Sequence, residues 1–460
     1  MDKRANDFSK GSVAGLILKQ AIPLSVSSFA QILYNIVDRV YIGHLPGEGI
    51  VPLTGLGLTL PVVSIISAFT LLFGQGGAPY FSIARGQGND KKAGRIMGNS
   101  AFLLIIGSIL LTLLGYVFMR PLLFALGADE DSYVYASDYL RIYLAGTAFL
   151  VISTGLNFYI TAQGFPKRSM AVILSGAVIN MLLDPLFIFK FGMGIKGAAV
   201  ATLISQTIPF VLVLYFLTGN RAAISLSSED MKPDGTLIFK IITMGFTGFI
   251  MEITNSATVI VCNKTLRHLG GDLYGNLYIT IMTIVTSVRS IMSVAVTGIT
   301  SGAQPVLGYN YGAKKYDRVL SGIRSCALFG FAYTAVAWLL ILLFPGFFIS
   351  MFSSDATTNA TAVGYLHIFF MAYVFMSLQF SGQSTFMALG KAPQAICFSL
   401  FRKVLLVIPL TLLLPLFLRD PVSGVFWAEP VSNIVGGSAS FFTMYFTVYR
   451  KLKKDQKSLG

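Results

Sequence analysis

Long apolar stretches alternate with short polar ones along the whole chain, and this pattern predicts twelve membrane-spanning helices. Many windows exceed the roughly 20 apolar residues that are needed to cross a bilayer. Several stretches are longer than the bilayer is thick, which a tilted helix accommodates. We therefore expect an all-α membrane protein. The expected spans are 15–44, 51–82, 93–119, 133–162, 168–190, 196–218, 237–267, 273–306, 317–345, 359–388, 394–417 and 423–448.

The longest polar interruption, residues 219–236, follows the sixth span and separates two halves that resemble each other. Short motifs recur at an offset of 226 residues: Pro79 and Gly86 match Pro305 and Gly312, and Tyr139–Ile142 matches Tyr365–Ile368. Six spans per half give both halves the same orientation, so we expect two parallel six-helix repeats around a central cavity. The expected organisation is an N-terminal lobe (1–218), a cytoplasmic linker (219–236) and a C-terminal lobe with a basic cytoplasmic tail (237–460).

Composition and charge agree with this organisation. The chain has 460 residues, of which 54% are hydrophobic and 12% charged, too apolar for one soluble domain. The net charge of +14 does not indicate nucleic acid, because the basic residues gather in alternate short loops and at both termini. This bias is typical of cytoplasmic loops. We expect a multi-pass protein of the cell inner (plasma) membrane with both termini in the cytoplasm.

An aspartate lies deep within the fifth span. Asp184 has apolar neighbours on both sides and is followed by Pro185, and Asn180 shares its helical face at a spacing of four residues. An ionised carboxylate at bilayer depth costs roughly 2.5–3.5 kcal/mol, so such residues are retained mostly for ions or substrates. A purely structural aspartate, neutralised by a neighbouring helix, is the other interpretation.

The first span carries a polar stripe at helical spacing, and the sixth span carries a second one. A lipid-facing stripe would be costly, so the first must face protein or water. Hydrogen bonding between helices would also explain it, but the carboxylate at its end favours a binding role. Such oxygens suit a hard cation, and they could instead hold a proton. The stripes are Gln31, Tyr34, Asn35 and Asp38 in the first span and Thr202, Ser205 and Gln206 in the sixth.

The second half carries different polar residues. The positions that match Asp38 and Asp184 are apolar there, which assigns the ion site to the first half. Glu252 and Asn255 are weaker candidates for contacting a cationic substrate, and Glu252 is equally suited to a structural role. Flexible methionines suit the walls of a cavity that takes varied substrates, although plain packing also explains them. The candidate methionines are Met282, Met292, Met376 and Met387.

Three segments resemble the multidrug and toxic compound extrusion (MATE) family, and the resemblance covers essentially the whole chain. They are LYNIVDRVYIG, ARGQGNDKKAGR and NMLLDPLFIFKFGMGIKGAAVATLISQ. The resemblance implies a cation site in the N-terminal lobe made by Asp38, Asn180, Asp184 and Thr202, with Tyr139 and Asn157 linked to it. Some relatives use an acidic pair in the C-terminal lobe. Glu252 matches one member of that pair, but the tenth span has no carboxylate for the other.

These observations predict a cation-coupled multidrug antiporter that exports lipophilic, mostly cationic compounds by alternating access. The coupling ion, sodium or a proton, is the only cofactor expected. Neutral oxygens from Asn180 and Thr202 favour sodium, which would bind to them together with Asp38 and Asp184. The expected partners are small-molecule drugs or toxic organic cations and the lipid bilayer. We expect no nucleic-acid partner, and a monomer.

The main alternative is a flippase for a lipid-linked oligosaccharide or another lipid, within the related superfamily. A flippase would need cationic side chains for a pyrophosphate head group. A membrane-embedded enzyme would need a dense His/Asp or metal-ligand cluster, and a channel would need a selectivity-filter loop; the sequence shows neither. The arginines that could serve a flippase are Arg39, Arg141, Arg289 and Arg402.

Overall fold

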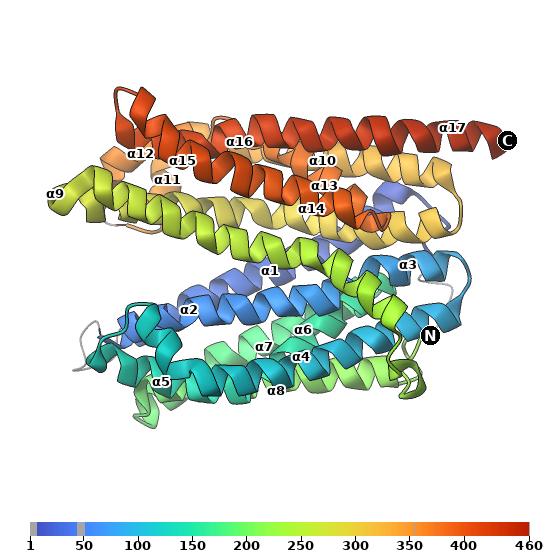
Figure 1. Cartoon of the computed structure of the whole chain (residues 1–460), viewed down its shortest axis with the longest axis horizontal. Coiled ribbons are helices and arrows are strands. Elements are labelled where there is room, and N and C mark those ends of the chain that lie inside the picture. Colours follow the sequence, from blue (N-terminus) through green and yellow to red (C-terminus); the bar gives the residue numbers. More distant parts are fainter. Residues whose placement is uncertain (1–6, 44–50, 354, 460) are drawn as a thin grey trace. The chain divides into compact units, whose positions relative to one another are not determined.

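The computed structural model describes residues 7–43, 51–353 and 355–459, and every regular element in these ranges is a helix (Figure 1). Nine helices in this part of the chain are long and apolar enough to cross a membrane, or eleven when each of two bent pairs counts as one span. A further helix, Pro421–Met444, has 24 residues and corresponds to the twelfth expected span. This arrangement is consistent with the twelve-helix expectation.

The helices of the first half follow the expected spans closely. They are α1 (Val13–Gly43), α2 (Val51–Thr70), α3 (Ala78–Gly86), α4 (Asp90–Ala125), α5 (Glu130–Ala145), α6 (Thr147–Ala162), α7 (Pro166–Pro185) and α8 (Gly194–Thr218). Two π-helical segments, η2 (Leu71–Gln75) and η3 (Leu186–Lys190), continue α2 and α7, and a short 3₁₀ turn, η4 (Glu229–Met231), lies in the linker.

The second half begins with α9, a helical stretch of 78 residues that turns back on itself at Gly271 (Figure 1). Gly271 has φ 58° and ψ −159°, a conformation that a glycine adopts readily. The elements of this half are α9 (Gly235–Gly312), α10 (Tyr316–Leu343), α11 (Pro345–Ser350), α12 (Ala356–Phe370), η5 (Tyr373–Phe375), α13 (Met376–Ala388), α14 (Ala392–Leu400), η6 (Phe401–Val407), α15 (Ile408–Phe417), α16 (Pro421–Met444), η7 (Tyr445–Tyr449) and α17 (Arg450–Leu459).

Several helices bend where the sequence interrupts their hydrogen bonding. The axes of α5 and α6 meet at 55° around Gly146, and the pair of α12 with Tyr373–Ala388 bends by 43°. Pro185 lacks a backbone N–H and cannot complete the α-helical ladder, and the π-helical η3 follows it directly. Single-turn π-helical insertions of this kind often occur at functional sites.

The chain folds into two compact units. Val26–Glu252 makes up most of the first unit, while Phe8–Ser25 and Ile253–Gly460 form the second. The first part of α1 therefore packs in the second unit, and the first part of α9 packs in the first unit. Each unit has its own apolar core, around Leu104 and Tyr159 in the first and around Phe370 and Phe426 in the second.

The first part of α9 in the first unit and the first part of α1 in the second unit are packed by close backbone contacts at glycines. In the first unit, Gly76 and Gly245 bring η2 and the beginning of α9 together, because a side chain at either glycine would overlap the facing backbone. In the second unit, Gly302 lies against the backbone of Ala21, where a side chain at Gly302 would also overlap it. Gly302 lies 226 residues after Gly76, at the matching position of the repeat. Small residues commonly permit such close packing of membrane helices. The same contact in both units matches the repeat seen in the sequence.

The linker belongs to the first unit and packs against its helices. Asn99 is fully buried and donates to the backbone oxygens of Asp230 and Lys232, and its own amide oxygen accepts from the N–H of Asp234. Gln163 makes two hydrogen bonds to the backbone of Ile224. The linker is therefore attached to α4 and α6 by buried amide groups.

A capping box starts α5. The Asp129 carboxylate accepts from the N–H of Ser132 at 2.8 Å and from its hydroxyl, and these hydrogen bonds hold the pKa of Asp129 below its ordinary value. Such caps satisfy N–H groups that a helix leaves without partners.

Large apolar side chains are exposed along many helices, as on Val117, Leu182 and Leu416, which expose 70%, 68% and 74%. In a water-soluble domain such surfaces would be unusual in number. They suit helices that face lipid.

Candidate functional site

The buried aspartate predicted in the fifth span lies at the end of α7, where the helix meets α8. Asp184, Asn180 and Thr202 are all fully buried. The amide nitrogen of Asn180 donates to Asp184 Oδ1 at 3.2 Å and to the Thr202 hydroxyl at 3.4 Å. One amide thus connects the carboxylate on α7 to the hydroxyl on α8.

The end of the polar stripe on α1 lies at the same place. Asp38 is 7% exposed and interacts electrostatically with Asp184. Tyr34 and Tyr139 both interact with the Asp38 carboxylate and with the Thr202 side chain. The structure therefore brings together, in one unit, six residues from four helices: α1, α5, α7 and α8.

Several buried oxygens at this site accept no hydrogen bond within the described part of the chain. They are Asp184 Oδ2, Asn180 Oδ1 and, on α6, Asn157 Oδ1. Buried acceptors without partners are uncommon and need an explanation. Two carboxylates that repel in a poorly hydrated site require a cation or a proton. Carboxylate, amide and hydroxyl oxygens are the ligands that hard cations prefer. The residues present fit a sodium ion or a proton.

A cavity of about 100 Å³ lies in the first unit among α1, α6, α7 and α8. Gln31 and Tyr34 from the polar stripe line it together with Asn157. Asn35, the remaining candidate from the stripe, is exposed. Apolar walls come from Leu150, Val172 and Ile173 among others. The cavity combines polar and apolar lining, as small-molecule sites commonly do.

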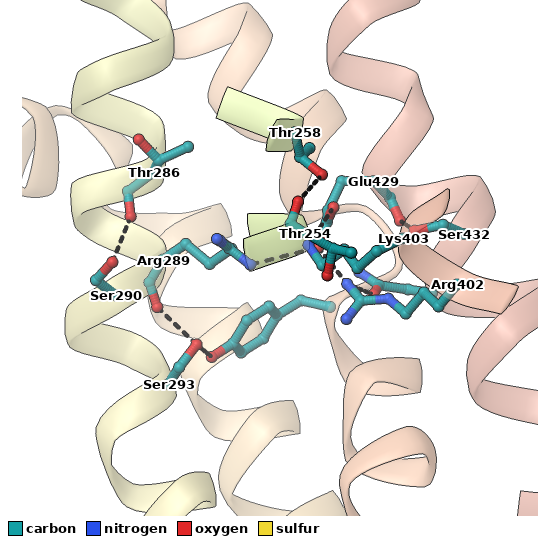
Figure 2. Close-up of polar contacts among 12 residues, drawn as sticks. Thr254, Thr258, Thr286, Arg289, Ser290, Ser293, Arg402, Lys403, Glu429 and Ser432 are labelled. Atoms are coloured by element: carbon teal, nitrogen blue, oxygen red, sulfur yellow. Dashed lines mark hydrogen bonds and ion pairs between the residues drawn. The ribbon is translucent and has the colours of Figure 1, made fainter. Parts of the chain in front are cut away.

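The second unit contains a charged cluster, buried except for the partly exposed Arg289, that the sequence analysis did not predict as a unit. Figure 2 shows Arg289, Arg402 and Lys403 directed towards Glu429. Arg402 forms an ion pair with Glu429 Oε1, and it donates to Asn433 Oδ1 at 2.7 Å. Arg289 lies 3.4 Å from Glu429 Oε1, and Lys403 lies 3.7 Å from Oε2. Arg402 and Lys403 lie in the π-helical segment η6, whose side-chain placement differs from that of a regular helix.

A cavity of about 210 Å³ adjoins this cluster within the second unit. Of the sequence candidates, Met282 and Asn255 line it. Met292 and Met376 pack in the apolar core of the unit, and Met387 is also buried. Glu252, the other candidate for substrate, is partly buried and is the last residue assigned to the first unit.

The arginines proposed for a flippase fall in different places. Arg289 lines the cavity of the second unit, and Arg402 forms the ion pair beside it. Arg141 is exposed on α5, and the side chain of Arg39 lies outside the described part of the structure. Lys403 was missed in the sequence, although two consecutive basic residues inside the apolar stretch 394–417 are as unusual as Asp184 is.

The MatE family model matches residues 23–186 and 253–413, one segment in each half of the chain. The multidrug export protein MepA of Staphylococcus haemolyticus is 24% identical over 458 residues, which cover 100% of this chain and 99% of that protein. Among solved structures, a crystal structure of MATE in complex with MaL6 has a TM-score of 0.90 at 21% identity, with 97% of this chain and 98% of that chain covered.

A MOP superfamily transporter from Pyrococcus furiosus, whose binding pocket is described as having reverse polarity, also has a TM-score of 0.90, at 20% identity and with 97% and 98% of the two chains covered. These solved structures establish the fold. The family match extends over both halves, and the helices and their two-unit arrangement agree with it. This chain is a multi-pass membrane protein that belongs to the MATE family of efflux transporters.

Proposed function

We propose that this protein is a sodium- or proton-coupled antiporter that exports lipophilic, mostly cationic compounds. The proposal rests on the buried oxygens of Asp184 and Asn180 that have no hydrogen-bond partner. A second carboxylate, that of Asp38, interacts with Asp184 at the same place. The name of the MepA relative, a multidrug export protein, supports small organic molecules as the exported class. The proposed location is the plasma membrane, with both termini in the cytoplasm.

In this proposal the ion and the drug are coupled because each stabilises a different arrangement of the first lobe. An inward-moving sodium ion or proton would offset one of the two negative charges of Asp38 and Asp184, reduce their repulsion, and draw their helices, α1 and α7, together with α8. Binding of drug would favour the other arrangement, so each ligand lowers the affinity for the other. Alternating access then returns the ion and expels the drug, as in other transporters built from repeats.

Sodium is the coupling ion that this site favours. A proton needs one basic oxygen, which either carboxylate alone provides. The site also contains the Asn180 and Thr202 side chains, whose neutral oxygens complete the shell of a hard cation. The unpartnered Asn180 Oδ1 is available for this purpose.

The test is drug export by purified protein in proteoliposomes, with sodium and proton gradients imposed separately. Asp184→Asn and Asp38→Asn should each abolish gradient-driven export while the protein stays folded and inserted. Thr202→Ala should weaken sodium dependence and spare any proton-driven component. A matched control is Asp138→Asn, because Asp138 is in the same unit but pairs with the exposed Lys196. Export at the wild-type rate in both aspartate variants would show that the site is structural.

One observation favours a second candidate, a flippase for a lipid-linked oligosaccharide or a related lipid. Two cationic side chains, Arg289 and Lys403, line the cavity of the second unit. Arginine and lysine are common ligands of phosphate groups. Movement of a fluorescent polyprenyl-pyrophosphate sugar between the leaflets of proteoliposomes would support this function, particularly if Arg289→Gln stops it. A lack of movement under conditions that support drug export would exclude it.

A further inference from the structure

The charges around the cavity of the second unit do not balance. Arg289, Arg402 and Lys403 carry three positive charges, and Glu429 is the only acid among them and the described residues that line the cavity. The cluster therefore has a net charge of +2 inside a lobe with an apolar core. If Lys403 gave up its proton, a net charge of +1 would remain. Buried charges are normally paired, so the excess indicates a missing anion.

The three cations contact Glu429 in different ways. Arg402 pairs with Glu429 and also donates to Asn433, and it is 5% exposed. Arg289 and Lys403 reach the same carboxylate at only 3.4 Å and 3.7 Å. These two residues line the cavity, whereas Arg402 does not. The two cations outside the Arg402–Glu429 pair are therefore the ones that line the cavity.

Donor groups of the cluster also lack acceptors. The Nε atoms of Arg289 and Arg402 are buried, and neither has a hydrogen-bond partner in the described residues. A guanidinium has five N–H donors and a lysine ammonium has three, while one carboxylate has two oxygens to share. An added oxyanion would supply the acceptors that the cluster lacks, and planar guanidinium groups match carboxylate and phosphate oxygens well.

The other residues that line the cavity indicate what the non-anionic part of the ligand is. Val259, Phe369, Val407 and Val425 provide apolar walls, and hydroxyl groups come from residues such as Thr286. The volume of about 210 Å³ is several times the roughly 30 Å³ that a water occupies in the liquid. The space therefore suits a small organic molecule with one anionic end better than a single ion.

We propose that the cavity of the second unit binds the carboxylate or phosphate group of a small amphiphilic molecule between Arg289 and Lys403, with its apolar part against the valine and phenylalanine walls. This site would let the transporter accept anionic or zwitterionic compounds in addition to cations. It lies in the other unit from Asp38 and Asp184, so it does not depend on the proposed ion coupling.

The experiment is binding of 2-naphthoate to the purified full-length protein in phosphatidylcholine nanodiscs, measured by isothermal titration calorimetry. The buffer contains potassium gluconate and no sodium, so a failure of ion coupling would not affect the result. We expect saturable binding, with 2-naphthylmethylamine, a cation of similar size, binding at least about tenfold more weakly. Arg289→Gln and Lys403→Gln should each weaken 2-naphthoate binding at least about tenfold, because each removes a charged donor.

Arg419→Gln is the matched control, because it removes the same charge from an exposed position in the same unit. It should leave binding unchanged. Glu429→Gln removes the competing carboxylate and should tighten binding, an outcome that misfolding cannot produce. The proposal is overturned if 2-naphthoate binds Arg289→Gln and Lys403→Gln as tightly as wild type, if the amine binds equally well, or if Glu429→Gln weakens binding although it remains folded at the temperature of the titration.

A second set of nanodiscs identifies the source of the oxyanion. Nanodiscs with one third phosphatidylglycerol present anionic head groups to the site. If they suppress 2-naphthoate binding to the wild type, the site takes lipid phosphate; if binding is unaffected, it takes free organic anions. Both results support an oxyanion site. Complete displacement of 2-naphthoate by 150 mM chloride, measured against gluconate, would contradict it, because the site would then be a halide site.

Discussion

Removal of the Glu429 carboxylate tests the electrostatics of the second unit directly. Glu429 is 5% exposed, and among the described residues its two oxygens are the only carboxylate oxygens in ion-pair contact with Arg289, Arg402 and Lys403. Glu429→Gln keeps the size of the side chain but leaves three cations without a counterion. Breaking a buried ion pair by removing one partner typically costs about 3–5 kcal/mol. We expect a loss of this size in the free energy of unfolding of the second unit.

Tryptophan fluorescence provides a measurement that is specific to this unit. The chain has two tryptophans, Trp338 and Trp427, and both belong to the second unit. Equilibrium unfolding in mixed micelles, followed through these residues, would give the change in free energy. Asp317→Asn is the control, because Asp317 is exposed in the first turn of α10 and its charge contributes at most about 1 kcal/mol.

The double variant Glu429→Gln with Arg402→Gln separates charge imbalance from loss of packing. It restores part of the charge balance, so it should recover about 1–3 kcal/mol relative to the sum of the single variants. A loss below about 1 kcal/mol for Glu429→Gln, similar to the control, would refute the reasoning. Such a result would mean that water, and not the carboxylate, stabilises the three cations by solvating them.

Four further predictions concern the topology, the substrate, the linker and a helix cap. In a cysteine-free background, a cysteine at Arg419 should react with an impermeant reagent outside intact cells and a cysteine at Lys167 should not; the reverse would overturn the topology. Glu252→Gln should weaken export of cations more than export of neutral compounds, and an equal loss for both would indicate a packing role. Asn99→Ala removes three hydrogen bonds to the linker and should speed its cleavage by trypsin in detergent, with unchanged cleavage counting against linker docking. The Asp129 carboxylate has a lowered pKa in the folded protein, so its stabilising contribution is complete above its unfolded pKa of about 3.9 and disappears as the pH falls through the folded value. The wild type should therefore lose more thermal stability than Asp129→Ala between pH 5 and about pH 2; parallel curves would show that the cap contributes nothing.

The sequence by itself determined the helices and their repetition. Each membrane helix satisfies its own backbone hydrogen bonds, so a long apolar run is sufficient to predict it. Their spacing of four residues predicted that Asn180 and Asp184 share one face of a helix. The structure shows the hydrogen bond between them. Polar residues inside apolar runs, such as Asp38, could also be found without a structure because their cost in lipid is independent of what they pack against.

Only the tertiary structure decided which of these faces meet. Asn180 and Thr202 are 22 residues apart, and Arg289 and Glu429 are 140 apart, so no local periodicity connects them. The exchange of the first parts of α1 and α9 between the two units depends on close approaches such as that of Gly76 and Gly245, which are 169 residues apart. The charged cluster of the second unit arises in the same way. An arginine or glutamate inside a span indicates that a partner exists, because an unpaired charge is costly there. The packing of the helices determines which partner it is. It is this packing that brings the three cations and the single carboxylate together.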